Sequence, residues 1–131
     1  MPTQPRILFV DDEPAMLESL RRSVWREFEA DLAMDADHGL DYLRRSGPYC
    51  IVVSDMRMPG MNGAELAREI KTKNPHLPVI LISGVNDIPP GASVADAFVS
   101  KVEGPDVLGK RIAAVLHRGK TQQDEPSAAT C

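Results

Sequence analysis

The sequence has few of the features that mark membrane, secreted or nucleic-acid-binding proteins. It has two cysteines in 131 residues, too few for a fold held by several disulfides or for a cysteine metal cluster. Its apolar runs are only a few residues long, whereas a bilayer span needs about 20, and no signal-like segment opens the chain. Acidic residues outnumber basic ones by 19 to 15, so the basic stripe of a nucleic-acid binder is missing. We therefore expect a cytoplasmic protein that binds neither membranes nor nucleic acid directly.

The sequence does contain short apolar runs that alternate with segments of helical period. Its length fits one domain, since domains cluster at roughly 100–150 residues. The alternation predicts an α/β fold with a parallel sheet, and three runs are continuous enough in Val, Ile, Leu and Phe to be central strands covered on both faces. The predicted strands are residues 6–10, 30–34, 49–54, 78–82 and 97–100.

Four segments have apolar residues at helical spacing. The first opens with Pro14, a residue favoured in the first turn, and places Leu17, Leu20, Val24 and Phe28 on one face. The other predicted helices cover about residues 37–46, 63–73 and 105–117. Residues 1–5 then form an N-terminal extension, residues 6–118 the domain, and residues 119–131 a disordered tail without periodicity.

The interval between the fourth and fifth strands is too short for an ordinary helix. Only residues 84–96 are available, and they include Pro89 and Pro90. An average helix needs about 11–12 residues and does not run through paired prolines. We expect at most a single turn there, and therefore a shortened or missing fourth helix.

Charged and hydroxyl side chains stand at the ends of four different strands. Asp11 and Asp12 follow the first, Asp55 the third, Ser83 the fourth and Lys101 the fifth. Because the carboxyl ends of parallel strands share one edge, these side chains can converge. Carboxylates ~4 Å apart repel by about 4 kcal/mol per pair at an effective dielectric of 20. The sequence therefore predicts a hard cation such as Mg²⁺ at this edge.

A magnesium ion beside a lysine would hold a phosphoryl group next to a carboxylate. Asp55 could then attack phosphorus and form an acyl phosphate. Lys101 supplies a second positive charge, and the Ser83 hydroxyl can donate to a phosphoryl oxygen. Taken singly, these residues have ordinary structural interpretations, because acids before Pro14 can cap a helix and Asp55 can stabilise a turn.

The motifs that contain these residues resemble the receiver domains of bacterial two-component response regulators. They are VDDE at 10–13, SDMRMPGMNG at 54–63, LISG at 81–84 and FVSK at 98–101. The resemblance covers roughly residues 5–118. It implies a flavodoxin-like, doubly wound sheet of five parallel strands in the order 2-1-3-4-5, in three layers.

The resemblance also implies a role for each acidic residue. Asp55 would be phosphorylated by a histidine kinase or a phosphotransfer protein. Asp12, Asp55 and the backbone carbonyl of Arg57 would bind Mg²⁺, with Asp11 assisting through water.

The remaining implied residues form a switch. Ser83 and Lys101 would bind the phosphoryl oxygens, and Phe98 would turn inward as Ser83 moves toward the phosphate, so that the changed surface signals to a downstream protein. The sequence departs from the family where Val102, rather than proline, follows Lys101.

Three functions fit these residues. The leading one is a stand-alone phosphoacceptor module with slow self-dephosphorylation at most. A degenerate receiver that only binds partners is an alternative, given the short interval and Val102. A phosphohydrolase with an aspartate nucleophile fits less well, because Arg57 stands where such enzymes carry a second aspartate.

Overall fold

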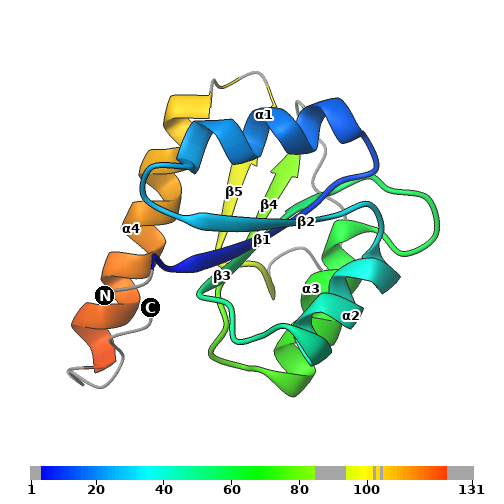
Figure 1. The fold of residues 1–131 in the computed structure, drawn as a ribbon. Helices are drawn as coiled ribbons and strands as arrows, with labels where there is room; N and C mark the ends of the chain where they lie inside the picture. Colours follow the sequence, from blue (N-terminus) through cyan, green and yellow to red (C-terminus); the bar gives the residue numbers. More distant parts are fainter. Residues whose placement is uncertain (1–3, 85–93, 102, 104, 124–131) are drawn as a thin grey trace.

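A parallel β-sheet separates two layers of helices in the computed structural model (Figure 1), which describes residues 4–84, 94–101, 103 and 105–123. The strand order is β2-β1-β3-β4-β5, and every neighbouring pair is parallel. The sequence therefore predicted the fold class, the strand order and the three layers correctly. The strands are β1 (Arg6–Val10), β2 (Glu29–Ala33), β3 (Ile51–Asp55), β4 (Val79–Ser83) and β5 (Ala97–Ser100).

Four helices cover the sheet within the described residues. They are α1 (Pro14–Val24), α2 (Ala36–Arg45), α3 (Gly63–Lys73) and α4 (Pro105–Gln123). Figure 1 shows α1 and α4 on one face and α2 and α3 on the other. No helix in this part of the chain is long and apolar enough to cross a bilayer.

Alternating side chains of the central strands supply both cores. In β1, Ile7 and Phe9 pack against α1 and α4, whereas Leu8 and Val10 pack against the α2 and α3 side. Successive side chains of a strand point to opposite faces, so a strand buried on both sides must be apolar throughout. This explains why the polar side chains of this protein gather where the strands end.

The first helix ends earlier than its apolar spacing predicts. Phe28 was expected on its buried face, but α1 ends at Val24 and the chain turns there, with the Phe28 amide donating to the Val24 carbonyl at 2.9 Å. The turn is needed because the next amide, of Glu29, pairs with the carbonyl of Pro5 at 2.9 Å to begin β2. Sheet pairing therefore ends this helix.

The last helix is longer than predicted. It was expected to end near residue 117, before a disordered tail from residue 119, but α4 continues to Gln123. Lysine and glutamine are good helix formers, and one internal glycine such as Gly119 costs only about 1 kcal/mol, so a helix already packed on the sheet can continue through it. The expectation of disorder is wrong for residues 119–123, and the rest of the predicted tail lies outside the described residues.

The predicted loss of a full helix between β4 and β5 falls on residues 85–93, which lie outside the described residues. The chain on either side is well defined by its contacts. The Asp96 amide donates to the Val79 carbonyl at 2.8 Å, and the Asp96 carboxylate accepts from the Val79 amide at 2.8 Å. These two bonds fix the start of β5 beside β4.

Gly63, the first residue of α3, allows the loop after β3 to return against the strand. A Cβ at this position would lie 2.5 Å from the backbone oxygen of Asp55 and 3.0 Å from the Cα of Met56. We expect Gly63→Ala to destabilise the protein by about 1–3 kcal/mol, as overpacking does when backbone must move. Urea unfolding followed by circular dichroism measures this change.

Gly109→Ala is the matched control. Gly109 lies inside α4, and a Cβ there meets nothing within 4 Å. The same substitution should therefore stabilise the protein by up to about 1 kcal/mol through helix propensity. Equal effects at the two glycines would show that the close approach at Gly63 is unimportant.

Candidate functional site

The carboxyl edge of the sheet brings four predicted site residues together. Asp11 follows β1, Asp55 and Ser83 end β3 and β4, and Lys101 follows β5. Backbone hydrogen bonds between neighbouring strands fix their register. The amide of Lys101 donates to the carbonyl of Ser83 at 2.8 Å, and the amide of Asp11 donates to the carbonyl of Ala33 at 3.0 Å. The positions follow from backbone pairing and do not depend on loop conformation.

Asp11, Asp12 and Asp55 form a carboxylate cluster. Each offers one oxygen such that the three oxygens lie within 4.8 Å of one another. Asp11 and Asp55 are 0% and 2% exposed, and Asp12 is more open to solvent. Asp11 Oδ2 and Asp55 Oδ1 are buried without a hydrogen-bond partner. Buried polar atoms normally have partners, so these two oxygens are suited to bind a cation.

Asp11 is held rigidly but its charge is poorly compensated. Its Oδ1 accepts a hydrogen bond from the Glu13 amide at 2.9 Å. Burial nevertheless raises the pKa of the Asp11 carboxyl from 3.8 to about 6, and repulsion from Asp55 adds to the increase. A bound divalent cation would reverse this increase.

Lys101 is the cation of the cluster in the protein itself. Its Nζ lies 3.1 Å from Asp55 Oδ1, although the geometry of the contact is that of an ion pair and not of an aligned hydrogen bond. Burial raises the pKa of Asp55, and Lys101 only partly opposes this. Burial alone would lower the pKa of Lys101, but the surrounding carboxylates outweigh it and raise that pKa. One lysine therefore does not balance three acids.

Three further predicted site residues, Ser83, Arg57 and Phe98, differ in burial and in contacts. Ser83 is buried and pairs with Ser100 across β4 and β5. Arg57 is exposed, and its backbone amide donates to the Asp55 carboxylate. Phe98 is half-buried and packs on the core beside α3, three residues before Lys101. The roles of these residues stay predictions. Val102, which stands where the family has proline, lies outside the described residues.

Gly63 contributes to this site by its backbone, although in the sequence it was interpreted only as the last residue of the 54–63 motif and as a helix start. The Gly63 amide donates to the Met56 carbonyl at 2.8 Å, which closes the loop after Asp55. Asn62 and Glu65 cap α3 reciprocally, each side chain accepting from the other residue's amide at 2.8 and 2.9 Å. A glycine directly after an N-cap asparagine was the available signal. The cap fixes where the acidic loop turns.

The donor set of the cluster fits a hard divalent cation. All the side-chain donors are carboxylate oxygens, which Mg²⁺ and Ca²⁺ prefer, and the two orphaned oxygens provide unfilled acceptors. Mg²⁺ usually keeps several waters and takes one or two carboxylates, which suits a cluster open only at Asp12. The structure thus brings together the three acids that the sequence predicts as metal ligands.

Metal binding at this cluster should depend on pH near the titration of Asp11. A cation needs the carboxylate form, so protons compete as the pH falls below about 6, the pKa of Asp11. We expect the Mg²⁺ affinity to fall roughly tenfold per pH unit there and to be nearly constant above pH 7. Titration calorimetry between pH 5 and 8 measures it. The same affinity at the two ends of this range would contradict the assignment of Asp11 to the metal site.

Comparison with known proteins gives a consistent result. The family model of the response regulator receiver domain matches residues 7–113. The response regulator MprA of Mycobacterium avium is 31% identical over 129 residues, which are 95% of this chain and 56% of that protein. MprA of Mycobacterium leprae has the same identity and coverage. The chain thus spans about half the length of these curated relatives.

Solved structures agree with the fold. The response regulator TrrA of Thermotoga maritima, in complex with Mg²⁺ and BeF, has a TM-score of 0.79 and 32% identity, over 86% of this chain and 99% of that one. A response regulator receiver domain protein of Clostridium thermocellum has a TM-score of 0.82 and 26% identity, over 91% and 99%. NtrX of Brucella abortus, in complex with ADP, has a TM-score of 0.84 and 29% identity, over 93% of this chain and 29% of that one.

Proposed function

Since this chain belongs to the response regulator receiver domain family, we propose that Asp55 accepts a phosphoryl group in a Mg²⁺-dependent reaction. Receiver domains are signalling domains rather than enzymes, and their phosphoryl groups come from histidine kinases or phosphotransfer proteins. The observation that supports the proposal most directly is the buried Asp55 oxygen without a hydrogen-bond partner, beside two further carboxylates and Lys101.

The reaction transfers a phosphoryl group without a change of oxidation state. A carboxylate oxygen of Asp55 forms a bond to phosphorus while the bond from phosphorus to the donor's histidine nitrogen breaks. The electron pair of the broken bond stays on the imidazole, and the product is an acyl phosphate. Asp11, Asp12 and Asp55 would hold Mg²⁺, which neutralises charge on the transferred group when it is bound.

Lys101 would also bind the transferred phosphoryl group. Its Nζ pairs with Asp55 Oδ1 at 3.1 Å before transfer, and once Asp55 carries the phosphoryl group the ammonium can bind a phosphoryl oxygen instead. Lys101 directly follows β5. When its ammonium moves from the Asp55 carboxylate to a phosphoryl oxygen, the position of the end of this strand can therefore change. Ser83, buried at the end of β4, would donate its hydroxyl to another phosphoryl oxygen. The two residues would thus couple the phosphate to the edge of the sheet.

The output would be a shift between two arrangements of the β4 and β5 ends. Phe98 lies opposite Leu81 in the ladder and is only half-buried, so its side chain has room to change its packing. A phosphoryl group that draws Ser83 inward would favour the inward position of Phe98. The population shift can be only as large as the difference in interaction energy between the two arrangements. The altered surface would then bind a downstream protein.

Incubation with acetyl phosphate tests the proposal without a kinase. We expect a single phosphoryl adduct in the intact mass when Mg²⁺ is present, and none in a chelator. The adduct should be lost in hydroxylamine, which cleaves acyl phosphates. Absence of an adduct in Mg²⁺ would favour the degenerate receiver that only binds partners, and rapid consumption of acetyl phosphate without an adduct would favour a phosphohydrolase.

A further inference from the structure

An apolar groove lies at the amino edge of the sheet, opposite the carboxylate cluster. Its volume is about 600 Å³, which is within the range of binding pockets. It runs between the turn that joins α1 to β2 and the C-terminal half of α4. Five apolar side chains line most of it: Pro5, Phe28, Ala113, Ala114 and Leu116. Glu27 and His117 complete the lining.

The helix face beside the groove has small side chains. Ala113 and Ala114 are exposed on α4, so at these two positions of the helix no long side chain fills the groove. Phe28 and Leu116 are only partly buried. The hollow is therefore open to another apolar side chain.

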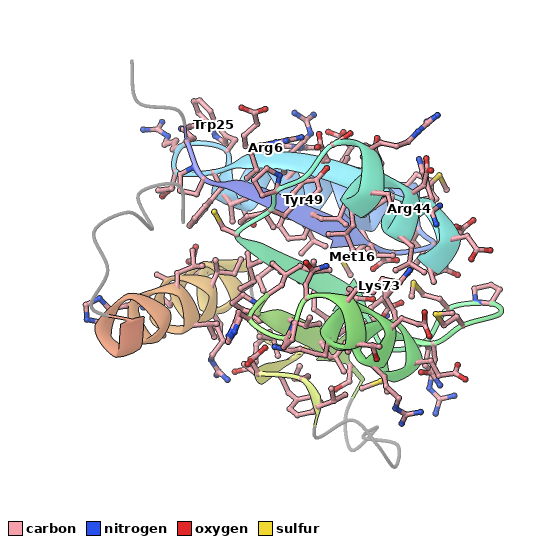
Figure 2. The ribbon with its side chains drawn as sticks, turned by 90° about the horizontal axis from the view of Figure 1, so that it is seen from below. Arg6, Met16, Trp25, Arg44, Tyr49 and Lys73 are labelled. Atoms are coloured by element: carbon pink, nitrogen blue, oxygen red, sulfur yellow. The ribbon has the colours of Figure 1, made fainter. Side chains whose placement is uncertain are left out.

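A tryptophan stands three residues before Phe28. Trp25 is 58% exposed, and it is one of two large apolar residues recorded as exposed in the described part of the chain. Figure 2 shows it at the outside of the molecule, near Arg6, where β1 begins. Exposed tryptophan is typical of binding surfaces, where Trp and Arg contribute most of the binding energy.

Two arginines flank this tryptophan. The Arg26 guanidinium lies 5.1 Å from the centre of the Trp25 ring. Arg22 is exposed in the last turn of α1, three residues before Trp25, the C-cap of that helix, which places these two side chains on the same side. In the described part of the chain, neither Arg22 nor Arg26 has a carboxylate oxygen within 4.0 Å, whereas the neighbouring Arg21 pairs with Glu18 at 2.6 Å. The hydrogen bond from Arg21 lowers the pKa of the Glu18 carboxyl most, and Arg22 adds to this, so the charge of Arg22 is partly compensated. Both Arg22 and Arg26 are exposed and can contact a partner.

Hydrogen bonds within the chain hold the turn that presents these residues. The amides of Glu27 and Phe28 both donate to the Val24 carbonyl, at 3.0 and 2.9 Å, and the Gln4 side chain donates to the Arg26 carbonyl. A surface that is already in its bound shape loses less entropy on association. The turn can therefore act as a fixed part of an interface.

We propose that this groove and the adjoining Trp25 turn bind an amphipathic, acidic segment of a partner protein. An apolar residue of that segment fills the groove between Phe28 and Ala114. Its carboxylates lie on the α1 side, over Arg22 and Arg26. The hollowed shape favours a peptide segment over a bilayer, which presents a flat surface. Because the amino edge is opposite Asp55, the partner stays bound whether or not the phosphoacceptor is modified.

Trp25 makes this proposal directly measurable, since it is the single tryptophan of the chain. The probe is a short helical peptide with leucines along one face and glutamates on the other. Titration should move the Trp25 emission to shorter wavelength and saturate. The twin peptide with lysine in place of glutamate should bind about tenfold more weakly or not at all. Equal binding of the two peptides, or no response to either, overturns the proposal.

Variants separate the groove from general electrostatics. Arg22→Glu should weaken binding of the glutamate peptide about tenfold, whereas Arg68→Glu, an equal charge change at an exposed position of α3, should leave it unchanged. Ala114→Gln fills the groove without changing the charge and should also weaken binding. Equal losses in Arg22→Glu and Arg68→Glu would overturn the proposal, as would normal binding by Ala114→Gln.

Two further measurements make the result independent of folding and of the phosphoacceptor proposal. Circular dichroism and the acetyl phosphate adduct should be unchanged in all three variants. Vesicles of phosphatidylcholine and phosphatidylglycerol serve as the membrane probe. A blue shift of Trp25 with these vesicles but not with the peptide would overturn a protein partner in favour of a lipid surface.

Discussion

Asp55→Asn should leave no detectable phosphoryl adduct after incubation with acetyl phosphate and Mg²⁺. The amide is nearly the same size as the carboxylate and can keep the hydrogen bond from the Arg57 amide. It is, however, a poor nucleophile, and it also removes one charge from the cluster. The expected effect is a complete loss of the adduct at unchanged secondary structure, measured by intact mass and circular dichroism.

Asp41→Asn is the control for this loss. Asp41 is partly exposed on α2 and pairs with Arg44 and Arg45 at 3.5 and 3.3 Å. Such surface pairs contribute about 0–1 kcal/mol, so the variant should be phosphorylated like the unaltered protein. An adduct that persists in Asp55→Asn would place the nucleophile on another residue of the cluster, and peptide mapping of the adduct would identify it.

Asp11→Asn should make the metal-free protein more stable. The buried Asp11 carboxylate has a pKa near 6 instead of 3.8, so holding it ionised above that pH costs on the order of 3 kcal/mol. The amide oxygen can still accept from the Glu13 amide, and the repulsion from Asp55 is removed. We expect Tm in chelator at pH 7.5 to rise by roughly 5 °C or more.

The size of this effect should change with pH and with metal. The folded protein takes up the Asp11 proton near pH 6 and the unfolded chain near 3.8, so the metal-free protein gains stability as the pH falls between these values. The difference between Asp11→Asn and the unaltered protein should therefore shrink toward pH 4. At pH 7.5, added Mg²⁺ should stabilise the unaltered protein and affect the variant much less.

Asp41→Asn is also the control for the change in Tm of Asp11→Asn. We expect its own Tm to change by a few degrees at most. A destabilised Asp11→Asn protein in chelator would contradict the view that uncompensated negative charge strains this edge. It would mean that the Asp11 carboxylate, through its bond to the Glu13 amide, contributes more to the fold than its burial costs.

The sequence was most informative where local pattern and tertiary environment agree. The predicted strands lie within one or two residues of the observed ones, since a strand covered on both faces is apolar throughout and an acidic or proline-containing segment ends it. Helix α3 matched at both ends because its boundaries are local signals: the Asn62 cap and the Asn74-Pro75 pair. The family motifs then gave the sheet order.

The two helix ends that were predicted wrongly depend on distant contacts. α1 stops at Val24 because Glu29 must reach the backbone of Pro5, and α4 continues to Gln123 although Gly119 interrupts its pattern. Gly63 shows the same limit, because only the folded chain reveals that a Cβ there would meet Asp55. The sequence by itself shows neither the hydrogen bond between Glu29 and Pro5 nor the steric clash that a side chain at position 63 would cause.

The sequence alone thus determined the fold class, the three acids and the position of the lysine, because parallel strands bring their carboxyl ends to one edge. Only the tertiary structure decided the energetics of that edge. Burial leaves two carboxylate oxygens without partners and raises the pKa of Asp11, and these consequences follow from how neighbouring elements exclude water. The groove between Phe28 and Ala114 likewise exists only because the α1–β2 turn and α4, far apart in the chain, pack side by side.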